Sequence, residues 1–137
     1  MSRLIKSALS VFAAGVVVLA TSTAAHADTV GHNACDKIVE SSTCEIHWEN
    51  RNLTVTGGVV FSAYGEYVTL SDYYADGKGV YVKVSWGNVF WSYWLTTGDN
   101  TGYGHDLNIK DGTVVTIKGC QTDNGALINC YDETMKA

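Results

Sequence analysis

Apolar and polar side chains alternate, residue by residue, along the most regular segment of this chain. In residues 80–86 (VYVKVSW), a valine or tryptophan takes every second position, and tyrosine, lysine and serine lie between them. A repeat of two is that of a β-strand with one buried face, so Val82 is expected in the core and Lys83 toward water. The turn sequences DGKG and GN bound the segment on its two sides. The pattern therefore predicts a half-buried strand over 80–86.

Strand-like segments and turn sequences follow one another at intervals of roughly 8 to 12 residues, a spacing typical of β-sandwiches and small barrels. The sequence thus predicts an all-β fold: an antiparallel β-sandwich of the Ig-like or Greek-key type, with about seven to eight strands. Residues 89–96 (VFWSYWLT) are apolar on both faces and are expected to form a central strand. A long loop is expected over 97–106, then a short strand over 105–110 and a hairpin turn at Asp111-Gly112.

The first 27 residues have the three parts of a secretory signal peptide. Arg3 and Lys6 precede an apolar run over 8–20, and the small residues Ala25 and Ala27 fit a cleavage site. The run is shorter than the ~20 apolar residues that span a bilayer. We expect cleavage after Ala27, a single secreted β-sandwich domain over 28–137, and no stable membrane anchor after cleavage.

All four cysteines lie in the predicted secreted domain, and an even number in a small exported domain predicts two disulfides. No C-x-x-C spacing suggests a zinc site. Of the three possible pairings we favour the two local ones, Cys35 with Cys44 and Cys120 with Cys130. Closing a loop of about 10 residues stabilises a fold by roughly 2.7 kcal/mol in the chain-entropy model.

The charge balance is acidic, with 14 Asp and Glu against nine Lys and Arg. Removing Arg3 and Lys6 with the signal peptide would leave the 14 acidic residues against seven basic ones. Nucleic acids and anionic membranes bind basic surfaces, so neither is an expected partner.

Two stretches, DYYADGKGVYVKVSW at 72–86 and NTGYGHDLNIKDGTVVTIKGCQTDNGALINC at 100–130, combine a D-x-x-A-D-G-x-G-V-x-V strand, a glycine-rich loop and two late cysteines. In this order they resemble small exported β-rich proteins of actinomycetes, a group with no established activity. The resemblance implies an exported β-domain, and it carries no catalytic residue to this chain.

Catalytic patterns are weak, and we expect neither an enzyme nor a cofactor. The nucleophile-elbow sequence G-x-S-x-G is absent. His105 and Asp106 are adjacent, but neighbours on a strand point to opposite faces and are poorly placed to act together. A glycosidase needs two carboxylates facing each other across a cleft. The candidates for such a pair are Glu66, Asp72, Asp76, Asp99 and Asp106. Glycosidases are usually larger than this, so a small secreted hydrolase is the less favoured alternative.

Some of the same carboxylates raise the question of calcium, which prefers oxygen ligands at loop ends. Asp72 and Asp76 bracket one turn, and Asp99, Asn100 and Asp106 bracket the expected long loop. Their spacing is not that of an EF-hand, and Asp and Asn in such positions usually serve the turns alone. We predict no metal site.

Aromatic residues give the strongest functional hint. If the odd-numbered residues of 89–95 face the core, Phe90 and Trp94 lie outside, unless they pack beneath the 97–106 loop. Exposed aromatic rings stack on sugars or anchor protein interfaces. We therefore predict a ligand-binding patch of Phe90, Trp94 and Tyr103 on a small secreted, non-catalytic binding protein, whose ligand is an unknown protein or glycan. A carbohydrate-binding module that uses the exposed aromatics is the alternative.

Overall fold

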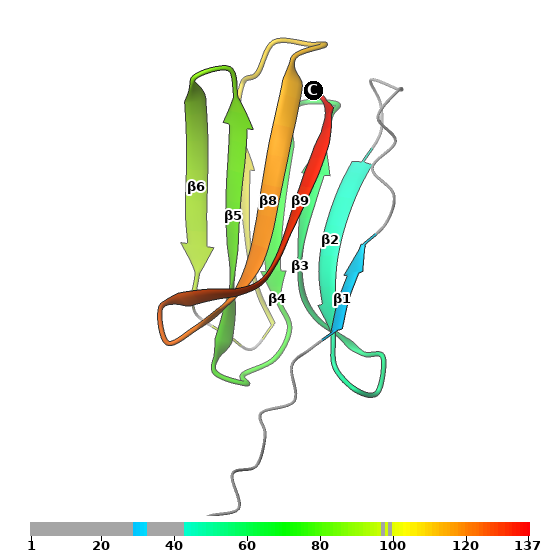
Figure 1. Cartoon of the computed structure of the whole chain (residues 1–137), viewed down its shortest axis with the longest axis vertical. Helices are drawn as coiled ribbons and strands as arrows, with labels where there is room; N and C mark the ends of the chain where they lie inside the picture. The colour runs from blue at the N-terminus through cyan, green and yellow to red at the C-terminus, as the bar shows by residue number, and fades with distance from the viewer. Residues whose placement is uncertain (1–28, 33–42, 97, 99) are drawn as a thin grey trace, which may run out of the picture.

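The computed structural model describes residues 29–32, 43–96, 98 and 100–137, and these form two antiparallel β-sheets (Figure 1). The five-stranded sheet has the order β1-β2-β3-β4-β7 and the four-stranded sheet the order β6-β5-β8-β9. The strands of the five-stranded sheet are β1 (Thr29–His32), β2 (Thr43–Glu49), β3 (Val55–Ser62), β4 (Tyr67–Asp72) and β7 (Thr101–Asp106). Those of the four-stranded sheet are β5 (Lys78–Trp86), β6 (Val89–Leu95), β8 (Val114–Asp123) and β9 (Ala126–Lys136).

The predicted all-β fold is confirmed, because the described residues contain strands and no helix. They form nine strands, where seven to eight were expected. In the same part of the chain, no helix has the length and apolar character needed to cross a membrane. The predicted signal peptide, residues 1–27, lies outside the described residues, as do Cys35 and Asp99.

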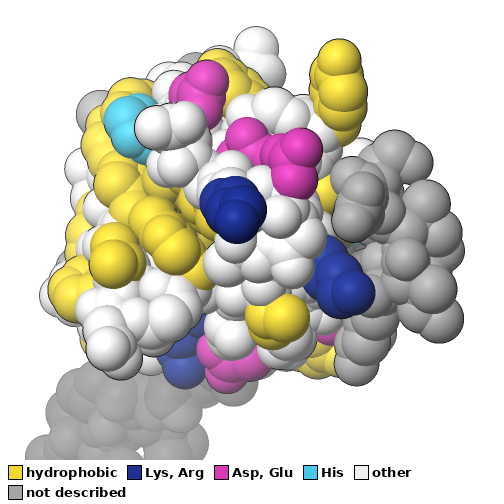
Figure 2. All heavy atoms as spheres, turned by 90° about the horizontal axis from the view of Figure 1, so that it is seen from above, with side chains coloured by type: hydrophobic (Ala, Val, Ile, Leu, Met, Phe, Trp, Pro, Cys, Tyr) yellow, Lys and Arg dark blue, Asp and Glu magenta, His cyan; other side chains and the backbone are white. Residues whose placement is uncertain are grey.

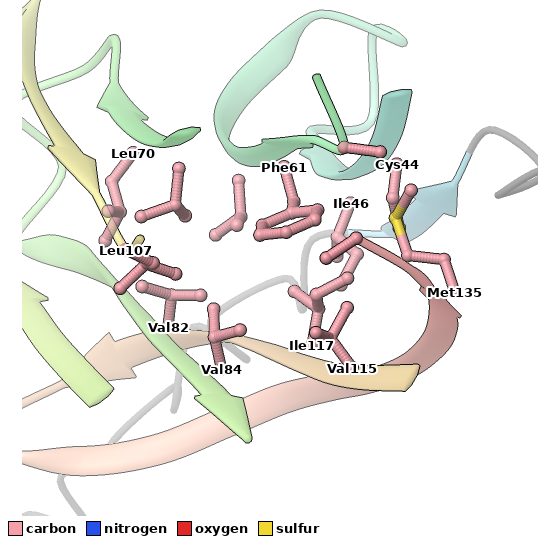
Figure 3. Close-up of a cluster of buried hydrophobic side chains, with 14 of the residues drawn as sticks. Cys44, Ile46, Phe61, Leu70, Val82, Val84, Leu107, Val115, Ile117 and Met135 are labelled. Atoms are coloured by element: carbon pink, nitrogen blue, oxygen red, sulfur yellow. The ribbon is translucent and has the colours of Figure 1, made fainter. Parts of the chain in front are cut away.

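The hydrophobic core lies between the two sheets (Figure 3). Val82 and Val84 of β5 point toward Phe61 and Leu70 of the five-stranded sheet, and all four side chains are completely buried. Burying one such side chain stabilises a fold by about 1.5–3 kcal/mol. Lys83, between the two valines, is only half-buried, so the register predicted for this strand is confirmed.

A part-buried hydrogen bond joins the two sheets. The Nε1–H of Trp48 on β2 donates to the backbone oxygen of Asn129 on β9 over 2.8 Å. The Trp48 side chain has no exposed surface, and a buried indole N–H without an acceptor would be costly. This bond therefore fixes how β9 sits against the opposite sheet.

Tight turns connect the strands of the four-stranded sheet where the sequence predicts them. Between β8 and β9, Asn124 and Gly125 both have positive φ (48° and 82°), and Asp123 pairs with Ala126. Two residues with positive φ are what a type I′ hairpin requires, and Asn-Gly is its preferred sequence.

Three expectations about the middle of the chain are wrong. Residues 101–106 form strand β7 and are not part of a loop, whereas 107–110 have no regular structure. The Asp111-Gly112 turn leads from the five-stranded to the four-stranded sheet, because β7 pairs with β4 and not with β8. β6 is an edge strand, not a central one. Both faces of β6 are apolar for a different reason: one face packs against the core, and the other carries exposed aromatic side chains.

The predicted disulfide between Cys120 and Cys130 is present and links β8 to β9. The pairing of these strands shifts between Gly119 and Gln121, so the bridge lies at an irregularity of the ladder. Cys44 is also disulfide-bonded. Its predicted partner, Cys35, lies outside the described residues, so this second pairing stays a prediction.

Candidate functional site

Aromatic side chains cover the outer side of β6, as the sequence predicts. Phe90 is 62% exposed and Trp94 is 41% exposed. Both side chains are exposed, so the prediction that Phe90 and Trp94 lie outside the core is confirmed.

Two side chains of β5 complete this surface. Tyr81 pairs with Trp94 across the two strands, with ring centroids 4.8 Å apart and planes inclined by 53°. The Nζ of Lys83 lies 4.6 Å from the centroid of the Phe90 ring, a cation–π distance. We call these four side chains, Phe90, Trp94, Tyr81 and Lys83, the outer aromatic face.

The opposite side of β6 carries a second group of aromatic rings, which we call the ring stack: Trp91 and Tyr93 of β6, and Tyr103 and His105 of β7. Trp91 lies on His105 at 4.8 Å with planes 3° apart, and Tyr93 lies on Tyr103 at 3.8 Å and 5°. All four side chains are half-buried. The ring stack joins the edge of one sheet to the edge of the other.

The structure does not bring all the predicted ligand-binding residues together. Trp94 contacts Tyr81 on the outer aromatic face, whereas Tyr103 stacks on Tyr93 on the other side of the same strand. Phe90 and Trp94 share one surface, and Tyr103 belongs to the ring stack.

Figure 2 looks onto the strand ends, from above the view of Figure 1. Hydrophobic side chains gather along one side of this end of the molecule, next to a histidine, and lysines and carboxylates lie elsewhere on the same surface. Val89, at the start of β6, is itself 54% exposed, although the odd-numbered residues of this strand were expected in the core. β6 therefore presents apolar surface at its first residue as well as along its outer side.

Three of the carboxylates considered for calcium or catalysis, Asp72, Asp76 and Asp106, accept hydrogen bonds from backbone groups two residues further along the chain. The Oδ1 atoms of Asp76 and Asp106 accept hydrogen bonds from the backbone N–H groups of Lys78 (2.9 Å) and Asn108 (3.0 Å). Asp72 is buried and accepts one from the N–H of Tyr74 at 3.4 Å. Within the part of the chain that the structure describes, no three His, Cys, Asp or Glu residues are grouped so that they could hold a metal ion.

His105 and Asp106 are also separated. The imidazole of His105 lies in the ring stack, and the Asp106 carboxylate is exposed and engaged with Asn108. The two side chains therefore point to opposite faces of β7, as expected for neighbours on a strand.

Sequence reasoning missed a charged strip on the outer side of β2. The Nε2 of His47 lies 3.2 Å from Glu49 Oε1, and its Nδ1 lies 3.7 Å from Glu45 Oε1. Gly31 and Gly58 are its neighbours in β1 and β3, and a Cβ on Gly31 would contact the imidazole. The alternation E-x-H-x-E in a strand was the signal, since it places all three side chains on one face.

Glu66, in the turn between β3 and β4, and Asp106 were both considered as catalytic carboxylates, and the structure brings them together with Asp111, which was not considered. Desolvation raises the pKa of the Glu66 carboxyl, and the negative charges of Asp111 and Asp106 raise that pKa further, as does a hydrogen bond with Asp111. These residues are far apart in the sequence, so only the fold reveals their proximity.

Comparison with protein families, with curated proteins and with solved structures finds no match for this chain.

Proposed function

We propose that this protein is a small secreted, non-catalytic binding protein, built as an Ig-like β-sandwich, and that the outer aromatic face is its ligand-binding surface. The observation that carries the proposal is the exposure of Phe90 and Trp94 on the same, water-facing side of β6, one on each side of Ser92. Large rings lose little conformational entropy on binding and bury much apolar area. The resemblance of residues 72–130 to small exported proteins of actinomycetes supports export and does not specify a ligand.

The geometry of the rings favours a protein ligand over a glycan. The plane of Trp94 is inclined by 53° to that of Tyr81, so the two rings do not make a flat platform for a sugar chain. The ammonium group of Lys83 lies over the Phe90 ring and occupies one of its faces. A surface of tilted rings beside a cation suits the core of a protein interface, where aromatic anchors fill shaped recesses.

The ring stack contributes little ring surface for a sugar. Trp91 lies on His105 and Tyr93 lies on Tyr103, with planes 3° and 5° apart, so each ring covers one face of its partner, and all four side chains are half-buried. Its contribution is to hold β6 in place against β7.

The test compares Trp94→Ala with Tyr64→Ala, a matched control at a tyrosine that is 85% exposed in the turn after β3. The immobilised wild-type protein and both variants are challenged with a panel of secreted and cell-surface proteins and with a panel of polysaccharides, and melting temperatures are recorded in parallel. We expect the wild type and Tyr64→Ala to capture a protein that Trp94→Ala does not, with all three melting temperatures similar.

Two other outcomes are informative. Capture of a polysaccharide, lost in Trp94→Ala, would favour the carbohydrate-binding alternative. A large drop in the melting temperature of Trp94→Ala would mean that this side chain serves packing, and the proposed binding surface would be wrong.

A further inference from the structure

In the part of the chain that the structure describes, the two sheets have four edge strands, β1 and β7 in one and β6 and β9 in the other. Edge strands expose unpaired backbone N–H and C=O groups, and proteins usually protect them with short length, charged side chains, proline or bulges. Three of the four edges have such protection. β1 has four residues, β7 (TGYGHD) contains an aspartate, and β9 contains Asp132, Glu133 and Lys136.

β6 is the unprotected edge. Its seven residues, VFWSYWL, include no charge, no glycine and no proline. Among the described residues, it pairs with β5 alone. Val89, Phe90 and Trp94 add exposed apolar surface to this edge. An uncharged aromatic edge of this length is suited to receive another extended strand by backbone hydrogen bonding.

The order of residues in β6 indicates which extended strand this edge would receive. VFWSYWL is nearly symmetric about its central residue, Ser92: aromatic residues occupy the two positions on each side, and an aliphatic residue occupies each end. When such a strand pairs antiparallel with a copy of itself, with Ser92 at the centre, each residue lies opposite a residue of the same kind, aromatic opposite aromatic and aliphatic opposite aliphatic. Phe90 lies opposite Trp94 of the second copy, and Trp91 lies opposite Tyr93 of the second copy.

We propose that the protein forms a two-fold symmetric dimer in which β6 pairs antiparallel with β6 of a second copy, centred on Ser92. Two-fold interfaces require a self-complementary surface, and the symmetric order of β6 provides one. Cross-strand aromatic pairs each contribute about 0.2–1 kcal/mol beyond an alanine pair. The two four-stranded sheets become one continuous eight-stranded sheet.

Electrostatics permits this contact although the chain carries a net charge of −5. Lys83 is the cation closest in register, because it pairs with Ser92 across β5 and β6. In the dimer the two copies of Lys83 are separated by three strand spacings, roughly 14 Å at about 4.8 Å each. That separation exceeds the Debye length of about 8 Å at physiological ionic strength, so the two lysines repel each other only weakly.

The dimer does not depend on the proposed ligand, but it changes the surface that the ligand meets. Phe90 and Trp94 of one copy lie beside Trp94 and Phe90 of the other, so the outer aromatic face is doubled across the two-fold axis. Two linked binding surfaces bind a repetitive or dimeric ligand more tightly than one alone.

Ser92 allows a test that leaves the single copy folded. In Ser92→Glu, the new carboxylate lies opposite Lys83 within its own sheet, a favourable cross-strand pair. Across the two-fold axis it meets an identical carboxylate, and like charges directly opposite are unfavourable. Sedimentation velocity of the purified protein over a wide concentration range measures the dimer dissociation constant, with Ser92→Thr as the uncharged control.

We expect the wild type and Ser92→Thr to dimerise, and Ser92→Glu to raise the dissociation constant at least about tenfold, without lowering the melting temperature at protein concentrations where the wild type is monomeric. Ser92→Lys is expected to weaken the dimer as well. An equal mixture of Ser92→Glu and Ser92→Lys should restore dimers, because residue 92 faces residue 92 across the axis.

Three results would overturn the proposal: a wild type that stays monomeric throughout, a Ser92→Glu protein that dimerises as tightly as the wild type, or a mixture of the two charged variants that stays monomeric. If the dimer is lost in Trp94→Ala but kept in Ser92→Glu, the copies associate through the outer aromatic face and not through the β6 edge. Ligand capture by a monomeric Ser92→Glu protein would leave the proposed function standing whatever the fate of the dimer.

Discussion

The ring of Tyr103 on β7 lies on the ring of Tyr93 on β6, with centroids 3.8 Å apart and planes within 5°. The two strands belong to different sheets and share no ladder of backbone hydrogen bonds. Side-chain stacking is therefore what holds these two edges together. Trp91 stacks on His105 in the same way, two residues away along each strand.

Removing this contact should loosen the fold. We expect Tyr103→Ala to lower the free energy of unfolding by about 2–3 kcal/mol, because the variant loses a half-buried ring together with the stacking contact that this ring makes. Urea denaturation measures the change. Tyr103→Phe keeps the ring and should cost much less, and Trp94→Ala on the outer side of β6 should stay within about 1 kcal/mol of the wild type. Equal losses for Tyr103→Ala and Trp94→Ala would contradict the separation of the ring stack from the outer aromatic face.

Neighbouring residues of β5 should respond very differently to the same substitution. Val82 has no exposed surface, and Val82→Asp would place an unpaired carboxylate in the core at a cost of several kcal/mol, comparable to the whole stability of a small domain. Lys83 faces the solvent side of the same strand, so Lys83→Asp should lower the melting temperature only slightly. Circular dichroism melting curves distinguish the two, and similar losses in both variants would show that the strand register is wrong.

The Glu66 carboxyl should make stability depend on pH. Folding raises the pKa of this group from its ordinary value of 4.5, so the folded state favours the protonated form. The stability that this contributes is present below pH 4.5 and is lost as the pH rises through the raised value. Glu66→Gln stays neutral at every pH, so its melting temperature should match that of the wild type in acid and exceed it near neutrality.

The cause of the Glu66 shift can be tested separately. Asp111→Asn removes one of the charges that raise the pKa, so it should also stabilise the protein near neutral pH and not in acid. If Glu66→Gln differs from the wild type by the same amount at both pH values, the carboxylates do not repel each other in the folded protein.

The sequence allowed the fold class and the register of β5 to be predicted because strict alternation has one structural meaning. Val80, Val82 and Val84 are buried, and the positions between them are not. The exposure of Phe90 and Trp94 followed from the same rule, applied to the next strand. The disulfide between Cys120 and Cys130 was also predictable, since short loops favour local pairing.

Strand β7 escaped prediction because its two glycines are typical of a loop. In the structure, the Tyr67 side chain of β4 lies against Gly104, and a Cβ at that position would collide with its ring and hydroxyl. The glycine is needed for close packing within a sheet, which a single sequence does not reveal. The stacking of Tyr103 on Tyr93 was missed for a related reason, and so was the proximity of Asp111 to Glu66 and Asp106, because only the folded chain brings these residues together.

The edge position of β6 was missed because apolar residues on both faces usually mark a strand covered on both sides. Here the outer side is apolar and exposed. Only the order of strands in the sheet distinguishes these two cases.

That order of strands also has a consequence for how the chain folds. β7 joins the five-stranded sheet only after the chain has passed through β5 and β6 of the other sheet, and the four-stranded sheet is interrupted by β7 in turn. Neither sheet is made from one continuous piece of chain, and the pairing of β4 with β7 joins residues 29 to 39 positions apart, which makes folding slower than for local contacts. The two layers should consequently form together, in a single cooperative transition, with no stage at which one sheet is complete and the other is absent.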